Sequence, residues 1–229
     1  MKVIALDGPS ASGKSSTARA VAQALGWSHL DSGALYRGLT LIALEMASVR
    51  RGLIEEVEPR EIIDAAESRG LQLHSDGTTF LIYLDGLPKD QAIRTYDVTA
   101  NVSWVSAIPE IRLWVDERMR EMVRGGLAVV IDGRDIGSVV FPEAPLKVFL
   151  TATPEARASR RLSQRGEELD RSALKRESAR LAERDRKDSS RPVAPLKQSA
   201  DALLLDSTSM TFAEQVDRIV GWARERGLT

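Results

Sequence analysis

The feature of this sequence that most constrains its fold is the run GPSASGKS at residues 8–15. It matches the pattern G-x-x-x-x-G-K-[ST]. A short apolar segment at 3–6 precedes it, and a helical pattern over 16–25 follows it. A strand, a glycine-rich turn and the start of a helix direct successive backbone N–H groups at one anion, so we expect a phosphate-binding loop. A chance match in a Gly/Ser-rich turn is the alternative, and the flanking segments argue against it.

The two residues at the end of this loop have the clearest expected roles. Lys14 would contact the β- and γ-phosphates of a nucleoside triphosphate such as ATP, and the Ser15 hydroxyl would hold Mg²⁺. The expected ATP-binding residues are Gly8, Pro9, Ser10, Ala11, Ser12, Gly13, Lys14, Ser15 and Ser16.

Composition narrows the class of protein. A chain of 229 residues with 43% hydrophobic residues suits one α/β domain with insertions, or at most two domains. No apolar run approaches the ~18 residues of a membrane helix, and Met1-Lys2 lead directly into a strand, so we expect no signal peptide and a cytoplasmic enzyme. The absence of cysteine excludes thiolate metal sites and cysteine nucleophiles. The net charge of −1 gives no sign of nucleic-acid binding.

Several apolar runs lack the alternation of a half-exposed strand, which is typical of a parallel sheet covered on both faces. The candidate strands are Val3–Asp7, Ser28–Asp31, Leu127–Asp132, Leu146–Thr151 and Ala202–Asp206. Helical patterns lie between them. The segment Gly70–Lys89 instead has two apolar runs around a turn at 75–78, and it predicts an antiparallel hairpin inserted into the α/β fold.

Polar residues at strand ends are the candidates for chemistry, because ligands of open α/β sheets bind beyond the carboxyl ends of the strands. Asp132-Gly133-Arg134-Asp135 follows one predicted strand, and Asp132 there could hold Mg²⁺. The alternative is a polar turn whose aspartates cap the backbone. Arg37, after another strand, could bind a second phosphate or be a surface arginine.

A second group lies in the basic stretch 155–191. Arg184, Asp188 and Arg191 share one helix face, and an exposed, ion-paired helix end is the alternative explanation. The only histidines, His29 and His74, have no metal-ligand spacing, and we interpret His29 as structural.

Together the motifs resemble the bacterial cytidylate kinases, a family of nucleoside monophosphate kinases. The matching stretches are Asp7–Ser10, Gly13–Ser15, Asp31–Arg37, Asp132–Asp135, Val140–Pro142, Glu183–Asp185, Arg191–Leu196 and Leu205–Thr208. The resemblance implies a single phosphate-loop kinase domain with a parallel five-stranded sheet flanked by helices. The implied core covers about 1–30, 113–153 and 171–229, a small antiparallel monophosphate-binding insert about 31–112, and a short lid about 154–170. The implied reaction is Mg²⁺-assisted transfer from ATP to CMP or dCMP.

The resemblance also implies roles for individual residues. The CMP-binding residues would be Ser32, Tyr36, Arg37, Ser103, Arg112, Arg134, Asp135, Arg184, Asp188 and Arg191. Among these, Ser103, Arg112 and Asp135 would face the cytosine, although the sequence around Ser103 fits the family less well. The catalytic residues would be Lys14, Arg134, Asp135, Arg157 and Arg161, and the metal site would be Ser15 and Asp132.

Two other classes of function stay open at this point. One is a phosphate-loop kinase for another small acceptor, such as UMP or shikimate. The other is a nucleotide-dependent regulatory switch, although no Asn-Lys-x-Asp guanine-reading motif is present. Our working expectation is a monomer whose partners are small nucleotides, with no nucleic acid and no membrane.

Overall fold

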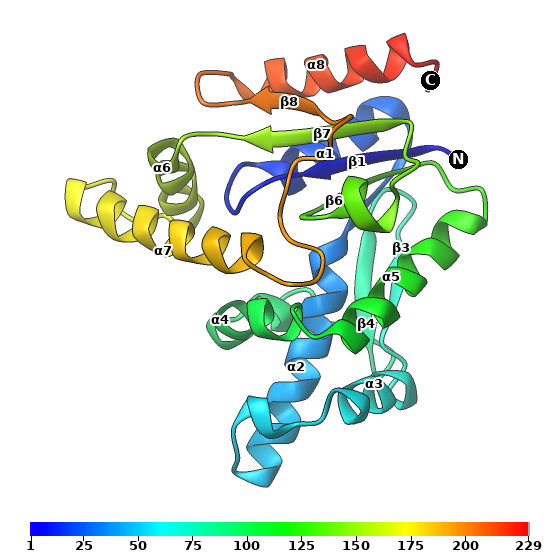
Figure 1. The fold of residues 1–229 in the computed structure, drawn as a ribbon, viewed down its shortest axis with the longest axis vertical. Coiled ribbons are helices and arrows are strands. Elements are labelled where there is room, and N and C mark those ends of the chain that lie inside the picture. Colours follow the sequence, from blue (N-terminus) through cyan, green and yellow to red (C-terminus); the bar gives the residue numbers. More distant parts are fainter. Residues whose placement is uncertain (229) are drawn as a thin grey trace. The chain divides into compact units, whose positions relative to one another are not determined.

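The computed structural model describes residues 1–228, and its main sheet confirms the predicted parallel arrangement (Figure 1). The five strands run in the order β2-β6-β1-β7-β8, and β1 pairs in parallel with both β6 and β7. Their bounds are β1 (Val3–Asp7), β2 (Ser28–Asp31), β6 (Val129–Gly133), β7 (Leu146–Thr151) and β8 (Leu203–Asp206). All five predicted strands are therefore present, with small differences at the ends of β6 and β8.

The chain forms two compact units. One, here the sheet unit, comprises Met1–Leu30 and Gly126–Thr229, and the other, here the inserted unit, comprises Asp31–Gly125. The extents of core, insert and lid that the resemblance implies, with the insert over about 31–112, remain predictions.

The core of the sheet unit explains why the strands are continuous apolar runs. Every residue of β1 is buried, as are Val130 and Val148 on its two neighbours. Helices α1 (Lys14–Leu25) and α8 (Phe212–Glu225) contribute buried residues such as Val21 and Ile219 to the same cluster. Burying each such side chain contributes about 1.5–3 kcal/mol, so these strands cannot slip without losing much of the core energy.

Two helices that pack against each other complete the sheet unit. They are α6 (Pro154–Arg165) and α7 (Arg171–Ser189), and each starts with a side-chain cap. The Thr153 hydroxyl accepts from the backbone of Ala156, and the Asp170 carboxylate accepts from the backbone of Ser172 at 2.6 Å. The α7 helix extends to Ser189 and therefore contains Arg184 and Asp188. Between β6 and β7 the chain makes a short π-helical turn, η3 (Ile136–Val140).

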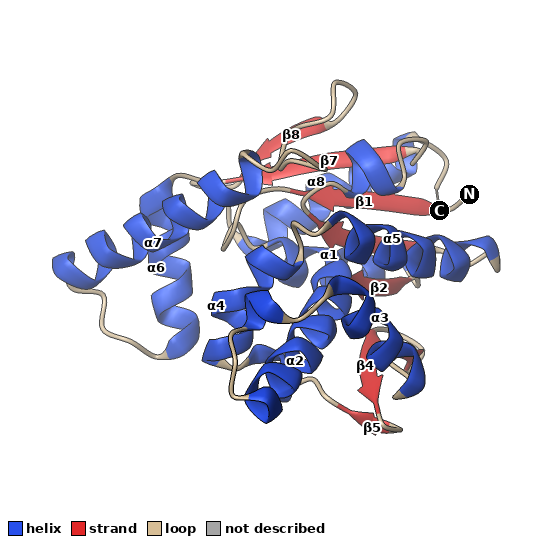
Figure 2. Ribbon diagram, turned by 60° about the horizontal axis from the view of Figure 1, so that its bottom comes forward, coloured by secondary structure: helices blue, strands red, loops and turns tan. Residues whose placement is uncertain are grey.

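The inserted unit contains the predicted antiparallel hairpin, extended by a third short strand (Figure 2). Its strands are β3 (Gln72–Ser75), β4 (Phe80–Leu84) and β5 (Leu87–Pro88), and its 3-10 turns are η1 (Ile54–Glu56) and η2 (Ala92–Arg94). Its helices are α2 (Ser32–Arg50), α3 (Pro59–Ser68), α4 (Tyr96–Val105) and α5 (Pro109–Arg124). The long helix α2 packs against α3, α4 and β4 and forms the centre of this unit.

Over residues 1–228, no helix combines the length and the apolar character that crossing a bilayer would require.

Candidate phosphate and nucleotide site

The register of the main sheet brings two polar segments to one edge. Asp7, the last residue of β1, lies opposite Gly133 of β6. The glycine-rich loop at 8–13 follows β1, and the turn at 133–135 ends β6. The two segments therefore begin side by side at the carboxyl edge of the sheet, where parallel sheets bind ligands.

The loop has a backbone that glycine makes possible. Gly8 has a φ of 150°, and a Cβ atom there would lie 2.0 Å from the carbonyl oxygen of Leu150 on β7. Gly13 has a φ of 94° and immediately precedes the first residue of α1. The loop therefore passes tightly over the sheet and delivers the chain to a helix N-terminus whose N–H groups can bind an anion.

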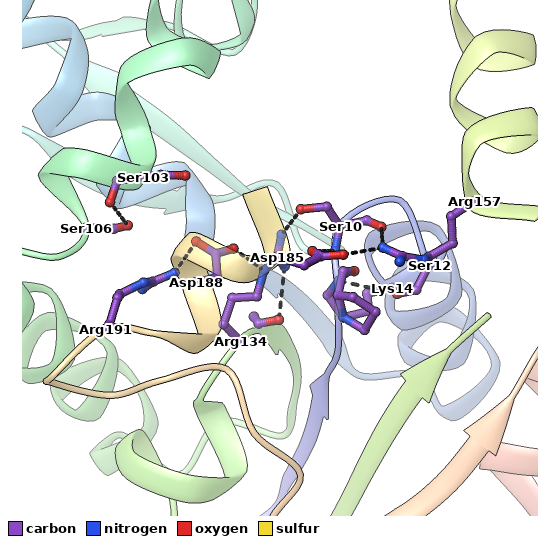
Figure 3. Close-up of polar contacts among 12 residues, drawn as sticks. Ser10, Ser12, Lys14, Ser103, Ser106, Arg134, Arg157, Asp185, Asp188 and Arg191 are labelled. Atoms are coloured by element: carbon purple, nitrogen blue, oxygen red, sulfur yellow. Dashed lines mark hydrogen bonds and ion pairs between the residues drawn. The ribbon is translucent and has the colours of Figure 1, made fainter. Parts of the chain in front are cut away.

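Lys14 is buried beneath this loop and is held by uncharged acceptors. Its Nζ atom donates to the carbonyl oxygen of Pro9 at 2.6 Å and to the Ser12 hydroxyl at 3.4 Å (Figure 3). Burial, with the charge of Arg134 in second place, lowers the pKa of Lys14 well below its usual value. A phosphate at the loop would supply the anion that stabilises the charged ammonium.

Ser15 and Asp132 meet as the sequence predicts for a Mg²⁺ site. The Ser15 hydroxyl donates to Oδ2 of Asp132 at 2.5 Å, and Nε2 of His29 lies 2.7 Å from Oδ1 of the same carboxylate. Burial alone would raise the pKa of Asp132, but the hydrogen bond and charge of His29, helped by Ser15, outweigh burial and lower it. A carboxylate that stays ionised beside a hydroxyl is a donor pair suited to Mg²⁺.

Residues 1–228 contain no group of three or more His, Cys, Asp or Glu side chains that could hold a metal ion by themselves. Mg²⁺ commonly keeps several waters and binds one or two protein oxygens together with substrate phosphates. The residues present therefore fit a Mg²⁺ ion that arrives with a nucleotide, and they do not fit an all-protein metal cage.

A cluster of arginines lies beside the loop. Arg134 donates from Nε to Oδ2 of Asp188 at 3.0 Å and from Nη2 to the Ser10 hydroxyl at 3.0 Å, while Arg191 binds the other oxygen of Asp188 (Figure 3). Burial would raise the pKa of Asp188, but the charges of Arg134, Arg191 and Arg184 lower it. Three cations thus act on one carboxylate, and the cluster carries net positive charge that favours a phosphate.

Arg157 lies deeper than a lid residue was expected to lie. It is buried, and it donates from Nη1 to the carbonyl oxygen of Ser10 at 2.9 Å and from Nε to that of Ala152 at 3.1 Å. It also pairs with Asp185, whose Oδ1 accepts from the Ser10 backbone N–H at 2.8 Å (Figure 3). Arg157 and Asp185 together hold both polar groups of the Ser10 backbone and so fix the shape of the loop.

Two residues that contact the loop, Asp185 and Arg160, have no role among the site residues expected from the sequence. Asp185 belongs to a matching motif but has no assigned role there, and Arg160 is absent from the expected set. Arg160 donates to the carbonyl oxygens of Ser12, at 3.3 Å, and Ser207. The only available signal was the helical spacing of Asp185 and Asp188, which places both near one face of α7. By contrast, Arg161, which the resemblance implies as a catalytic residue, donates from Nη1 to Oε1 of Gln164 on its own helix at 3.0 Å.

Asp7 anchors the turn that contains Asp135. Its two carboxylate oxygens accept from the backbone N–H groups of Ile136 and Gly137, each at 2.8 Å. Asp135 is buried, and its carbonyl oxygen accepts from Val139 at 2.9 Å at the start of η3. Burial raises the pKa of Asp7 to about 6, against the lowering effect of the two N–H groups.

The inserted unit brings two of its predicted residues, Tyr36 and Arg112, into contact. The Arg112 guanidinium lies 5.4 Å from the centre of the Tyr36 ring and donates to the Ser106 carbonyl oxygen at 2.9 Å. Arg37 donates to the hydroxyl of Thr99 at 3.2 Å.

Two further predicted residues of the inserted unit are serines. Ser32 is the first residue of α2 and is buried, behind an Asp31 cap that accepts from Gly33 at 2.9 Å. The carbonyl oxygen of Ser103 accepts from the Ser106 hydroxyl at 3.3 Å (Figure 3).

A glycine-rich loop of this geometry, on a parallel sheet of this order, defines a phosphate-loop protein that binds nucleotides. A family model described as cytidylate kinase matches residues 4–225. Curated proteins named cytidylate kinase from Streptococcus equi subsp. zooepidemicus and from Streptococcus pyogenes serotype M4 are each 42% identical to this chain. The alignment with the first relative covers 94% of this chain and 93% of the relative. The alignment with the second covers 97% of this chain and 94% of the relative.

The chain therefore belongs to the cytidylate kinase family, and it is an enzyme of that type. This confirms the resemblance inferred from its motifs. A solved structure of an uncharacterized protein from Eubacterium ventriosum covers 97% of this chain and 98% of its own, with a TM-score of 0.54 at 10% identity. That likeness shows the fold alone.

The raised pKa of Asp7 predicts an unusual pH dependence of stability. Between its unfolded value of 3.8 and about 6, the folded state holds a proton that the unfolded state has lost. The contribution of Asp7 to stability is thus present below pH 3.8 and is lost as the pH rises through 6, by about 3 kcal/mol at most. Urea unfolding between pH 4 and 7 should show the wild-type free energy of unfolding falling relative to that of Asp7→Asn.

Ile219→Val, a change in the core that adds no titratable group, should show a constant difference from wild type over the same range. A difference between wild type and Asp7→Asn that is flat, or that grows with pH, would contradict the raised pKa.

Proposed function

We propose that this enzyme transfers the γ-phosphoryl group of ATP to CMP and dCMP, giving ADP and CDP or dCDP. The observation that carries the proposal is the hydrogen bond of 3.0 Å between Arg134 and the Ser10 hydroxyl. It joins two anion-binding groups, the glycine-rich loop and the arginine cluster around Asp188. A donor triphosphate and an acceptor monophosphate need such neighbouring groups.

The chemistry proposed for the chain is mainly alignment and charge. Phosphoryl transfer has a loose transition state with charge spread over the transferred oxygens, and positioned cations stabilise it. Lys14 and Arg134 would supply positive charge on either side of the transferred group. Arg191, Arg184 and Asp188 would bind the CMP phosphate and sugar, and Arg37 of the inserted unit would add a second guanidinium on CMP.

The predicted lid at 154–170 would exclude water from the reacting phosphates. Within the lid, Arg157 hydrogen-bonds to the backbone of the phosphate-binding loop. We therefore propose two roles for Arg157, one in catalysis and one in fixing the shape of the loop. Arg161, on the same helix, is the second proposed lid arginine.

We also propose that Ser15 and Asp132 hold Mg²⁺ together with the ATP phosphates. Bound Mg²⁺ would neutralise part of the phosphate charge during transfer. The residues of this chain have a separate task, which is to keep a hydroxyl and an ionised carboxylate directed at one point.

Recognition of cytosine needs an acceptor for its N4 amino group and donors for N3 and O2. We propose that Asp135 provides the acceptor and that Arg112 and Ser103 of the inserted unit provide the donors. Uracil presents an acceptor where cytosine presents the amino group, so a carboxylate disfavours UMP.

We expect the enzyme to act as a monomer in the cytoplasm, where its nucleotide substrates are available.

An acceptor survey tests the proposal. With ATP and Mg²⁺, we expect kcat/KM for CMP and dCMP to exceed that for UMP by about tenfold or more, and shikimate to be inert. A coupled assay of ADP release gives these values. UMP outpacing CMP and dCMP by about tenfold would indicate another acceptor kinase. Tight ATP binding without CMP-dependent ADP release would indicate a regulatory switch.

The role of the Lys14 charge can be separated from folding. Lys14→Met keeps the side-chain volume but removes a charge whose burial is costly, so we expect thermal stability equal to or above wild type. Turnover should fall by about 100-fold or more. Lys147→Met is the matched control, because Lys147 is also buried but pairs with the carboxylate of Asp201. It should keep its kcat, and near-wild-type turnover of Lys14→Met would refute the charge role.

The cytosine contact predicts a selective effect on one substrate. Asp135→Asn keeps the shape but replaces one acceptor oxygen by a donor, so we expect KM for CMP to rise by about 10- to 100-fold. KM for ATP should stay within about threefold of wild type, and discrimination against UMP should weaken. Steady-state kinetics with each nucleotide varied in turn provides the check. Equal losses for both nucleotides would argue against a cytosine-facing Asp135.

A further inference from the structure

One polar contact in the sheet unit has no place in the proposed reaction. His29, on β2, is fully buried, and its Nε2 atom lies 2.7 Å from Oδ1 of Asp132 on the neighbouring strand β6. The sequence by itself indicates a structural role for this histidine. Its partner is the carboxylate that we propose as a Mg²⁺ ligand.

The two oxygens of Asp132 have separate tasks. Oδ1 faces the His29 ring, and Oδ2 accepts from the Ser15 hydroxyl at 2.5 Å. Because an ionised carboxylate can only accept, Nε2 carries the proton of this contact. A carboxylate held at one oxygen by a buried ring has little freedom to rotate away from Ser15.

The surroundings of the other ring nitrogen, Nδ1, indicate that His29 acts as a polar residue through its contact with Asp132. Nδ1 of His29 is buried and has no hydrogen-bond partner within residues 1–228. An apolar residue would fill the same space without leaving a buried nitrogen unsatisfied. The ring therefore carries a polar cost that only its bond to Asp132 offsets.

We propose that His29 is a positioning residue, which holds Oδ1 of Asp132 so that Oδ2 stays directed at Ser15 and at Mg²⁺. This inference rests on the proposed metal site. Partners that orient a metal ligand typically change metal affinity by about 10- to 100-fold when they are removed. A purely structural histidine is the alternative, and the following test separates the two.

The test measures how strongly Mg²⁺ and nucleotide binding are coupled. Isothermal titration calorimetry gives the Kd of ADP with Mg²⁺ and with EDTA, and the ratio of the two is the coupling. His29→Leu removes the donor, so we expect the coupling to fall by about tenfold, with Kd in EDTA unchanged. His29→Gln can donate from the position of Nε2, so we expect it to retain the coupling within about threefold.

A destabilised control keeps the result interpretable. Ile219→Ala shortens a buried side chain of α8, which leaves a cavity in the core of the sheet unit. It lowers the free energy of unfolding without changing a residue that contacts Asp132. We expect its coupling to match wild type. If Ile219→Ala loses as much coupling as His29→Leu, the effect comes from lost stability and the inference is wrong.

Other results of the same titrations would overturn the role of His29 or the metal site itself. Wild-type coupling in a folded His29→Leu, or equal losses in the Leu and Gln variants, would overturn the role of His29 and leave the metal site standing. No coupling in the wild-type enzyme would overturn the proposed metal site and this inference with it.

Discussion

The parallel pairing of β1 with β6 is the constraint on which the rest of the site depends. In this register Asp7 lies opposite Gly133, so the glycine-rich loop and the turn after β6 leave the sheet at adjacent points. The contact between Ser15 and Asp132, which are 117 residues apart, requires that register. Both faces of β1 are buried, so a slip by one residue would place each side chain in a space that is packed for another, and the packing of the core therefore fixes the geometry of the site.

Several charged side chains around the loop lie beside a charge of opposite sign, but Lys14 does not hydrogen-bond to one within residues 1–228. Asp188 has Arg134 and Arg191, and Asp185 has Arg157, while Asp132 has the His29 ring as a hydrogen-bond partner. Buried charges are stable in proteins when they are paired in this way. The hydrogen-bond acceptors of Lys14 are uncharged, and its pKa is lowered accordingly. The site is therefore built around a cation that gains most from the arrival of a phosphate.

Much of this architecture follows from the sequence because it depends on short-range signals. Five apolar runs predict the five strands, the motif at 8–15 predicts a strand, a loop and a helix, and the turn at 75–78 predicts the hairpin. The pairing of Ser15 with Asp132 was also predictable, since Asp132 lies at the carboxyl end of one strand and Ser15 follows the loop at the carboxyl end of another. These features need no knowledge of how distant side chains pack.

The contacts that the sequence did not predict depend on packing between distant segments. Arg157 reaches the Ser10 carbonyl oxygen across 147 residues, and no periodicity within α6 indicates that its guanidinium is buried. Asp185 likewise has a neighbour in the loop that helical spacing alone does not identify. His29 looked like a core residue because its segment is apolar, and its partner became visible only when β2 and β6 were adjacent.

The most direct test of the central claim is the ionisation of Lys14 with and without bound nucleotide. NMR titration of side-chain-labelled lysine reports the pKa of its Nζ group in the free enzyme and in the complex with ADP. We expect a value well below that of an ordinary lysine in the free enzyme and a clear rise when ADP binds, because the phosphates supply the missing anion. A pKa that does not change when the nucleotide binds would contradict the claim that this buried cation is the phosphate-binding centre.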